Sequence, residues 1–161
     1  MSGSYNKNTD QVKRVALGAD HGAFAAKEAV KTYLTIAGYS IVDVGTDSGT
    51  TAVDYPDFAY AVAQKVVSGV CDRGIMLDGA GIGSSMACNK VRGVRAALCW
   101  NSKTIINSRM HNNANVLTMG SGMHNIDEIC SLAKLWLETG FEGGRHWPRI
   151  NKITEIEKNR R

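Results

Sequence analysis

The sequence predicts a single-domain α/β protein, a three-layer sandwich in which helices cover both faces of a five-stranded parallel sheet. Short apolar runs of strand type alternate, along the chain, with longer segments whose apolar residues recur at helical spacing. The length of 161 residues is that of one domain with a substantial core. The apolar and charged fractions, 43% and 21%, are those of a globular chain.

The first two strand–helix units are marked by turn residues at their ends. Residues 15–19 form an apolar run of strand type, and residues 23–37 carry apolar side chains at roughly helical spacing. Gly38 stands where such a helix would end. Residues 40–44 predict the second strand, and Pro56 suits the first turn of a helix that extends to residue 68.

A glycine-rich turn separates the third strand from the third helix. The strand is predicted over 74–77, the turn reads Asp-Gly-Ala-Gly-Ile-Gly-Ser-Ser over 78–85, and a helix is expected to begin near Ser84. The last two units repeat the alternation. Their strands are predicted over 93–98 and 115–119, and their helices over 102–110 and 126–138.

Such a series of units implies a doubly wound, Rossmann-like sheet, because crossovers between parallel strands are right-handed. Ligands of these folds bind at the carboxyl ends of the strands. His111 and Asn112 precede the fifth strand at the opposite edge, so they could reach a site only across a subunit interface. The segments at the carboxyl edge are Asp20-His21, 45–55, 78–85, the residues from Cys99 onward and 120–124.

The charge and hydropathy of the chain argue against two classes of partner, nucleic acids and membranes. The net charge of +4 is modest and the basic residues are dispersed except at the C-terminus, so nucleic acid is not an expected partner. No apolar stretch approaches the length of a membrane span, so we expect no membrane association. We assign residues 1–13 to a flexible N-terminal leader, 14–153 to the domain and 154–161 to a C-terminal tail.

The cysteines and the N-terminus indicate a cellular location. The polar residues 1–10 lack the apolar segment of a signal peptide, although a targeting tag of another type stays open. The cysteines lie near apolar runs and form no CxxC pair. We expect reduced, mostly buried thiols in a cytoplasmic protein. The four cysteines are Cys71, Cys88, Cys99 and Cys130.

The glycine turn is a candidate anion cradle. Gly79, Gly81 and Gly83 let the backbone fold tightly, and the following helix N-terminus adds partial positive charge. Dinucleotide-binding domains use a similar turn, but after their first strand and with an acidic ribose ligand beyond it. Neither condition holds here. Asp78 begins the turn, and it suits a general base and a helix cap equally well.

Three further polar groups are candidates for a site. Asp20 and His21 abruptly end an apolar strand, which favours a functional pair over a satisfied surface pair. His111 stands in a segment rich in hydrogen-bonding side chains, which is also typical of a capped structural loop. Arg145 and Arg149 could grip a phosphate bidentately, although such arginines more often form surface ion pairs.

Six segments, in order along residues 14 to 153, carry a resemblance to a known family. They are GADHGAFAAKE (18–28), VDVGT (42–46), DYPDFA (54–59), GAGIGSSMACNKVRGVRAALC (79–99), RMHNNANVLTMGS (109–121) and FEGGRH (141–146) with Arg149. Together they resemble the type B ribose-5-phosphate isomerases and the related galactose-6-phosphate isomerase subunits. The resemblance implies an enzyme that interconverts an aldose phosphate and a ketose phosphate without a metal or other cofactor. Ribose 5-phosphate and ribulose 5-phosphate are the default substrate pair.

The resemblance also implies a homodimer, paired into a tetramer in some members, with each active site at the subunit interface. His111 would reach into the partner's site and assist ring opening there. The glycine turn would hold the enediolate oxygens through backbone N–H groups. The implied substrate-binding residues are Asp20, His21, Tyr55, Gly79, Gly81, Gly83, Ser84 and Asn112, with Arg145 and Arg149 binding the phosphate from the partner chain.

Asp78, Ala80 and Gly122 depart from the family pattern, which makes the chain a divergent member. Asp78 stands where many members have a cysteine base, and Ser84 stands where others have a glutamate base, so Asp78 is the candidate base. Ala80 replaces a usual threonine or serine, and Gly122 replaces an arginine that binds phosphate. Two alternatives stay open: an isomerase of a four- or six-carbon sugar phosphate, and a non-catalytic subunit that binds sugar phosphates.

Overall fold

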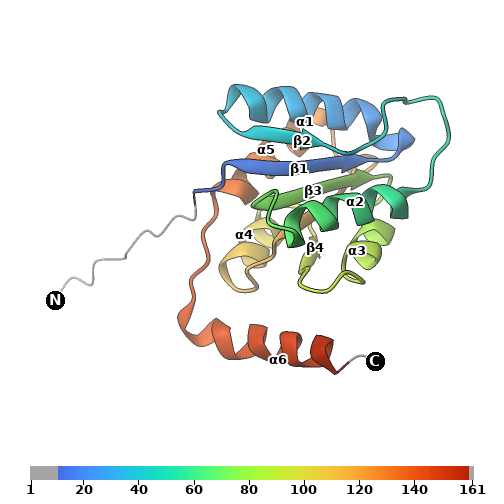
Figure 1. The fold of residues 1–161 in the computed structure, drawn as a ribbon. Coiled ribbons are helices and arrows are strands. Elements are labelled where there is room, and N and C mark those ends of the chain that lie inside the picture. The colour runs from blue at the N-terminus through green and yellow to red at the C-terminus, as the bar shows by residue number, and fades with distance from the viewer. Residues whose placement is uncertain (1–10, 160–161) are drawn as a thin grey trace.

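The computed structural model describes residues 11–159, and these form a five-stranded parallel sheet with helices on both faces (Figure 1). All five predicted strand–helix units are present. The strands are β1 (Arg14–Ala19), β2 (Ser40–Asp43), β3 (Arg73–Asp78), β4 (Ala96–Leu98) and β5 (Val116–Gly120). The helices of these units are α1 (Phe24–Ile36), α2 (Tyr55–Val67), α3 (Ile82–Cys88), α4 (Ser102–Met110) and α5 (Ile126–Glu138), with a short 3₁₀ turn η1 (His21–Ala23) before α1.

The strand order creates a switch point between β1 and β3. The sheet runs β2-β1-β3-β5-β4, so the chain adds β2 on one side of β1 and β3 on the other. In the parallel register Ala19 pairs with Leu77, which sets the carboxyl ends of the two strands side by side. Ligands of doubly wound sheets bind at such a point. The residues that follow are Asp20 after β1 and Asp78 at the end of β3.

The core consists of two apolar layers, one on each face of the sheet. Alternate residues of a strand face opposite sides, so Val15 and Leu17 pack with α1, α4 and α5, while Ala16 packs with α2 and α3. β1, β3 and β5 are buried on both faces, which explains why the sequence shows apolar runs there rather than alternation. Within residues 11–159 no helix is long and apolar enough to cross a membrane.

The main departure from the predicted elements lies at the C-terminal end. A 3₁₀ turn η2 (Gly144–His146) leads into α6 (Trp147–Lys158), a helix that the sequence prediction did not include and that continues past residue 153, where the tail was expected to begin. Ile150 is its one buried residue within the described range, whereas Ile153 and Ile156 are exposed. Its apolar residues recur every three positions from Trp147 to Ile156, but the helix follows the last strand–helix unit and has no strand of its own. In Figure 1 the helix lies apart from the sheet.

Ten of the thirteen residues of the predicted leader, 1–10, lie outside the described residues, so the leader stays a prediction. A smaller difference concerns the beginning of the fourth strand. β4 begins at Ala96 rather than at residue 93. The Arg95 N–H donates to Asn115 Oδ1 at 2.7 Å, so a side chain takes the place of the strand partner there.

Candidate active site

The carboxyl ends of β1 and β3 bring the first predicted residues together. The Asp20 N–H donates to the Leu77 carbonyl at 3.3 Å. Asp20 Oδ1 accepts from the Ala23 N–H at 3.1 Å and caps η1. His21 Nδ1 accepts from the Val53 N–H at 3.2 Å, so a neutral His21 ring carries its proton on Nε2. Asp20 and His21 therefore sit at the switch point in defined orientations.

Close packing around two glycines shapes the turn. Gly81 has a φ of +76°, and a Cβ there would lie 2.6 Å from Leu98 Cδ1 and 2.9 Å from the Met119 backbone carbon. A Cβ at Gly83 would lie 2.7 Å from Tyr55 Cε2 and would overlap the Tyr55 hydroxyl. Only glycine fits either position without displacement of its neighbours. The Tyr55 ring, 38% exposed, thus lies directly against the turn.

The Asp78 carboxylate occupies the centre of the turn and is 6% exposed. Its Oδ1 accepts from the Ala80 N–H at 2.9 Å and, by a shorter bond, from the Gly81 N–H. Its Oδ2 accepts from the Ser84 N–H at 3.2 Å and, by another short bond, from the Ser84 hydroxyl. Four donors therefore face the lone pairs of one carboxylate. The predicted anion cradle holds an anion that belongs to the protein itself.

Two other N–H groups of the turn are left for a ligand. Among residues 11–159 no acceptor is bonded to the N–H of Gly79 or of Gly83. Gly79 is exposed, and a Cβ added to it would meet nothing within 4 Å. A ligand oxygen therefore has open space beside the turn. On the other side, the Gly122 N–H donates to the Gly79 carbonyl at 3.1 Å and fixes the turn to the loop after β5.

The thiol that is electrostatically coupled to Asp78 is inert. Burial, reinforced by the negative charge of Asp78, raises the pKa of Cys88 to about 12. The Cys88 Sγ also donates to the Ala59 carbonyl at 3.3 Å. Because the thiolate is the reactive form, this cysteine does not offer a base near neutral pH. All four cysteines are buried and free.

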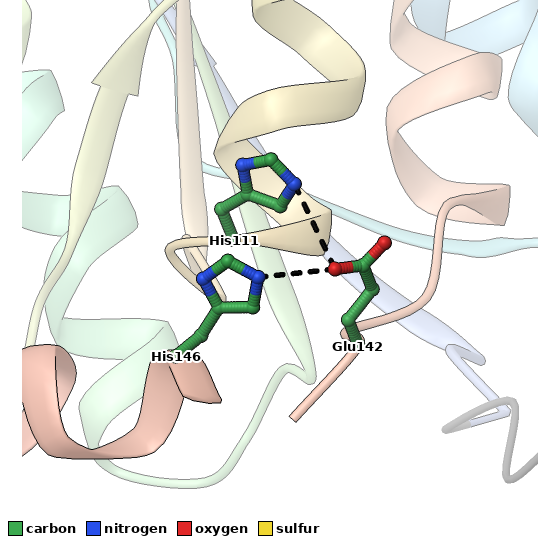
Figure 2. Close-up of side chains that lie close together, drawn as sticks. All are labelled: His111, Glu142 and His146. Carbon is green, nitrogen blue, oxygen red and sulfur yellow. Dashed lines mark hydrogen bonds and ion pairs between the residues drawn. The ribbon is translucent and has the colours of Figure 1, made fainter. Parts of the chain in front are cut away.

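His111 lies away from these residues, in a cluster with Glu142 and His146 (Figure 2). It follows α4 directly and precedes β5, so it stands at the amino edge of the sheet. The imidazoles of His111 and His146 stack with centroids 4.3 Å apart and planes inclined by 11°. Both Nε2 atoms face Glu142 Oε2, at 3.7 Å from His111 and 3.0 Å from His146. Neither Glu142 nor His146 was a predicted site residue, and their spacing of four residues is a weak signal.

The cluster also meets the distance criterion for a metal site. The candidate ligand atoms of His111, Glu142 and His146 lie within 4.8 Å of one another. An imidazole, however, binds a metal along a lone pair in the plane of its ring. Two rings in nearly parallel planes cannot direct both Nε2 lone pairs at one ion without rotating. The Glu142 carboxylate instead accepts a hydrogen bond from His146 and lies near His111 without a hydrogen bond to it.

The structure divides the predicted site residues into two groups. Arg145 and Arg149 are exposed on η2 and α6, beside His146, and the Arg149 Nη1 donates to the Arg145 carbonyl at 3.3 Å. No hydrogen bond, ion pair or ring contact within residues 11–159 joins the two groups. The Asp78 group comprises Asp20, His21, Tyr55, Asp78, Gly79, Gly81, Gly83 and Ser84, and the His111 group comprises His111, Asn112, Arg145 and Arg149.

Known proteins match the chain over nearly its whole length. The model of the family described as Ribose/Galactose Isomerase matches residues 15–153. Ribose-5-phosphate isomerase B of Escherichia coli is 38% identical over 149 residues, which are 92% of this chain and 99% of that protein. A putative sugar phosphate isomerase of Bacillus subtilis is 42% identical over 145 residues, or 90% of this chain and 97% of that protein. Ribose-5-phosphate isomerase B of Clostridium thermocellum has a similar structure, with a TM-score of 0.87 at 45% identity, covering 90% of this chain and 97% of the other.

Proposed function

The chain belongs to the ribose/galactose isomerase family, and we propose that it interconverts ribose 5-phosphate and ribulose 5-phosphate. The observation that carries the proposal is the turn after β3, where a buried carboxylate lies beside two backbone N–H groups without an acceptor among residues 11–159. Isomerisation of an aldose to a ketose needs both parts. A base must move a proton between carbon 2 and carbon 1, and fixed donors must stabilise the enediolate.

We assign the base to Asp78. A carboxylate with four donors must release one of them before it can accept a proton from carbon 2. Three of the donors are backbone N–H groups, whereas the Ser84 hydroxyl can rotate about its Cβ–Oγ bond. Rotation of that hydroxyl would open Oδ2 for the proton. The N–H groups of Gly79 and Gly83 would then bind the enediolate oxygens.

The remaining residues of the Asp78 group would bind the sugar. Asp20 and His21 follow β1 beside the end of β3, and Tyr55 lies against Gly83, so these residues flank the turn that carries Asp78. In this assignment Asp20 and Tyr55 contact sugar hydroxyl groups. His21, with its proton on Nε2, donates to the sugar or to its phosphate.

We further propose a homodimer whose active sites each combine the Asp78 group of one subunit with the His111 group of the other. The support is that no contact within the described part of the chain joins the two groups. The side chains of Ile153 and Ile156 on α6 are exposed, as expected for a helix that packs on a second subunit. In the dimer the partner subunit's His111 would assist ring opening, its Asn112 would hold a hydroxyl, and its Arg145 and Arg149 would bind the phosphate.

A cytoplasmic location is part of the proposal. The support is that all four cysteines are free thiols and none forms a disulfide bond. The reducing cytoplasm keeps thiols in this state.

Two observations support alternative functions, a different sugar phosphate substrate and a subunit without catalytic activity. Gly122 leaves the loop after β5 without the cation of the family pattern, which favours a sugar phosphate of another length, with four or six carbons. The four hydrogen bonds on Asp78 favour a subunit that binds sugar phosphates without turnover. Both alternatives make predictions that one assay separates.

The test is an isomerase assay in deuterated water with four-, five- and six-carbon aldose phosphates. We expect turnover of ribose 5-phosphate above the others, with solvent deuterium in the product. Asp78→Asn should abolish the exchange at carbon 2 and leave binding of the substrate largely intact. Asp72→Asn is the matched control, because the Asp72 carboxylate also accepts backbone N–H groups, from Lys13 and Arg14, but lies at the amino edge. Binding without turnover of any substrate would identify the non-catalytic subunit instead.

A further inference from the structure

The two nitrogen atoms of the His111 ring have different polar neighbours. Nδ1 lies 2.9 Å from the side-chain nitrogen of Asn107, one turn earlier on α4. Nε2 lies 3.7 Å from Glu142 Oε2. A dashed line in Figure 2 marks this contact. In a neutral imidazole one nitrogen donates and the other accepts, so the neighbours determine which nitrogen carries the proton.

The orientation of the Asn107 amide follows from a fixed acceptor in the backbone. The side-chain nitrogen of Asn112 lies 3.3 Å from the Asn107 carbonyl oxygen, which can only accept, so this atom must be the Asn112 NH₂ group. The same NH₂ group lies 3.1 Å from the side chain of Asn107, which therefore presents its Oδ1 on that side. The Asn107 NH₂ group then faces His111 and donates to Nδ1. Hydrogen-bond chemistry thus orients both amides.

The opposite side of the ring leads to the same tautomer. An ionised carboxylate accepts hydrogen bonds and donates none. Glu142 Oε2 accepts from His146 Nε2 at 3.0 Å and also faces His111 Nε2. His146 is 5% exposed, and its ring stacks on His111, which restricts rotation of both imidazoles. A donor on Nε2 of His111 suits this carboxylate, and an acceptor there would not.

We propose that Asn107 is a positioning residue that holds neutral His111 in the tautomer with its proton on Nε2. His111 then presents a hydrogen-bond donor, and not an acceptor, to the ring oxygen of the sugar when the ring opens. The tautomer follows from the contacts of this chain alone, whereas its use in ring opening rests on the proposed function. Glu142 Oε2, at 3.7 Å, lies beyond hydrogen-bond distance of His111 Nε2, so within the described residues the Nε2–H has no bonded acceptor and can donate to a substrate oxygen.

The sharpest test reverses the partner of Nδ1. In Asn107→Asp, both side-chain oxygens accept, so the contact with Nδ1 requires a proton there and the tautomer should switch to Nδ1–H. Asn107→Leu removes the donor without adding charge. Ser102→Asp is the control, because it places the same negative charge on the exposed first turn of α4, where a carboxylate is favourable.

The readout is the ¹⁵N NMR spectrum of the histidine rings, recorded where the imidazoles are neutral. The chain has 4 histidines, and the His111→Gln variant identifies the signals of His111. We expect an unprotonated Nδ1 and a protonated Nε2 in the unmodified protein and in Ser102→Asp, and the reverse in Asn107→Asp. A protonated Nδ1 in the unmodified protein, or an unchanged tautomer in Asn107→Asp, would overturn the proposal.

Kinetics test the functional half separately. With ribose 5-phosphate, Asn107→Asp should lower kcat about tenfold or more, a part of what a positioned donor contributes, while Ser102→Asp leaves kcat unchanged. Asn107→Leu should fall between them. An unchanged kcat after the tautomer has switched would show that ring opening does not use this proton. If the unmodified protein turns over no sugar phosphate, the proposed function fails while the tautomer result stands.

Discussion

Replacing Asp78 with asparagine changes the carboxylate that organises the turn after β3. An asparagine side chain has one oxygen and one NH₂ group where Asp78 has two oxygens. The backbone N–H groups of Ala80 and Gly81 cannot turn away, so the amide oxygen should remain on their side. The NH₂ group would then face Ser84. The Ser84 hydroxyl can rotate and accept from it, but the Ser84 N–H loses its acceptor in a buried environment.

The magnitude follows from these bonds. A buried donor without an acceptor costs about 1–3 kcal/mol, and loss of the charge from the remaining bonds costs about 1 kcal/mol more. We therefore expect the Asp78→Asn substitution to lower the free energy of unfolding by about 2–4 kcal/mol. This loss is independent of any role in catalysis, because it arises from hydrogen bonds within residues 78–84.

The assay is urea unfolding followed by far-ultraviolet circular dichroism, with Asp72→Asn as the control. The Asp72 carboxylate accepts N–H groups at 2.9 Å from both Lys13 and Arg14, but it is exposed, so water can replace those bonds. We expect the control to lose about 1 kcal/mol or less. A loss in Asp78→Asn that is no larger than in Asp72→Asn would refute the inference that Asp78 holds the turn together.

Three further predictions concern the fold. Gly81→Ala should lower the free energy of unfolding by about 2–4 kcal/mol, because the new Cβ adds backbone strain and overlaps its neighbours. Gly38→Ala is the control, because Gly38 also has a positive φ but a Cβ there meets nothing within 4 Å, so it should cost about 1 kcal/mol. Urea unfolding measures both losses, and equal losses would count against the packing argument. Burial alone would raise the pKa of Asp43, but hydrogen bonds led by that of Lys27 outweigh it and hold the pKa below its usual value. Asp43 therefore stabilises the fold at pH values above the pKa of an aspartate in the unfolded chain, about 3.9, and this stabilisation is lost as the pH falls through the lower pKa of the folded state. In Asp43→Asn, the free energy of unfolding should depend less on pH in that range. An unchanged pH dependence would contradict the prediction. Cys88 should resist alkylation by iodoacetamide at pH 8 in the folded protein and react after unfolding, because its pKa is raised in the folded state. Mass spectrometry of the labelled peptide measures the reaction. Rapid labelling of the folded protein would be inconsistent with the raised pKa.

The sequence predicted the architecture because the central strands β1, β3 and β5 contain apolar runs and the helices α1, α2 and α5 each have a buried apolar stripe. The bounds of α4 (Ser102–Met110) and α5 (Ile126–Glu138) agree with the prediction to the residue. α6 was missed although its apolar side chains recur every three residues, at Trp147, Ile150, Ile153 and Ile156. It follows the last strand–helix unit, so the alternation that predicted the other helices did not extend to it. Of these four side chains only Ile150 is buried within the described residues.

A site residue could be placed from the sequence only where the order of strands and helices determines its position on the sheet. Asp20 and Asp78 end adjacent strands, and His111 precedes a strand, so their opposite edges of the sheet follow from topology alone. The hydrogen bonds of Asp78 do not follow from topology, because the conformation of the turn brings the N–H groups of Ala80, Gly81 and Ser84 to one carboxylate. The contacts of His111 with Glu142 and His146 were equally inaccessible, since they depend on where the segment after α5 returns to the end of α4.

The separation of the two groups has a genetic consequence. In the proposed dimer, a chain damaged in its glycine turn still supplies an intact His111 group to its neighbour, and a chain damaged at His111 still supplies an intact turn. Two alleles that are each inactive as homodimers would therefore restore part of the activity when expressed together, since each mixed dimer rebuilds one complete site. Two alleles damaged in the same group would not. Complementation between defective copies would thus map, residue by residue, which half of the site each side chain serves.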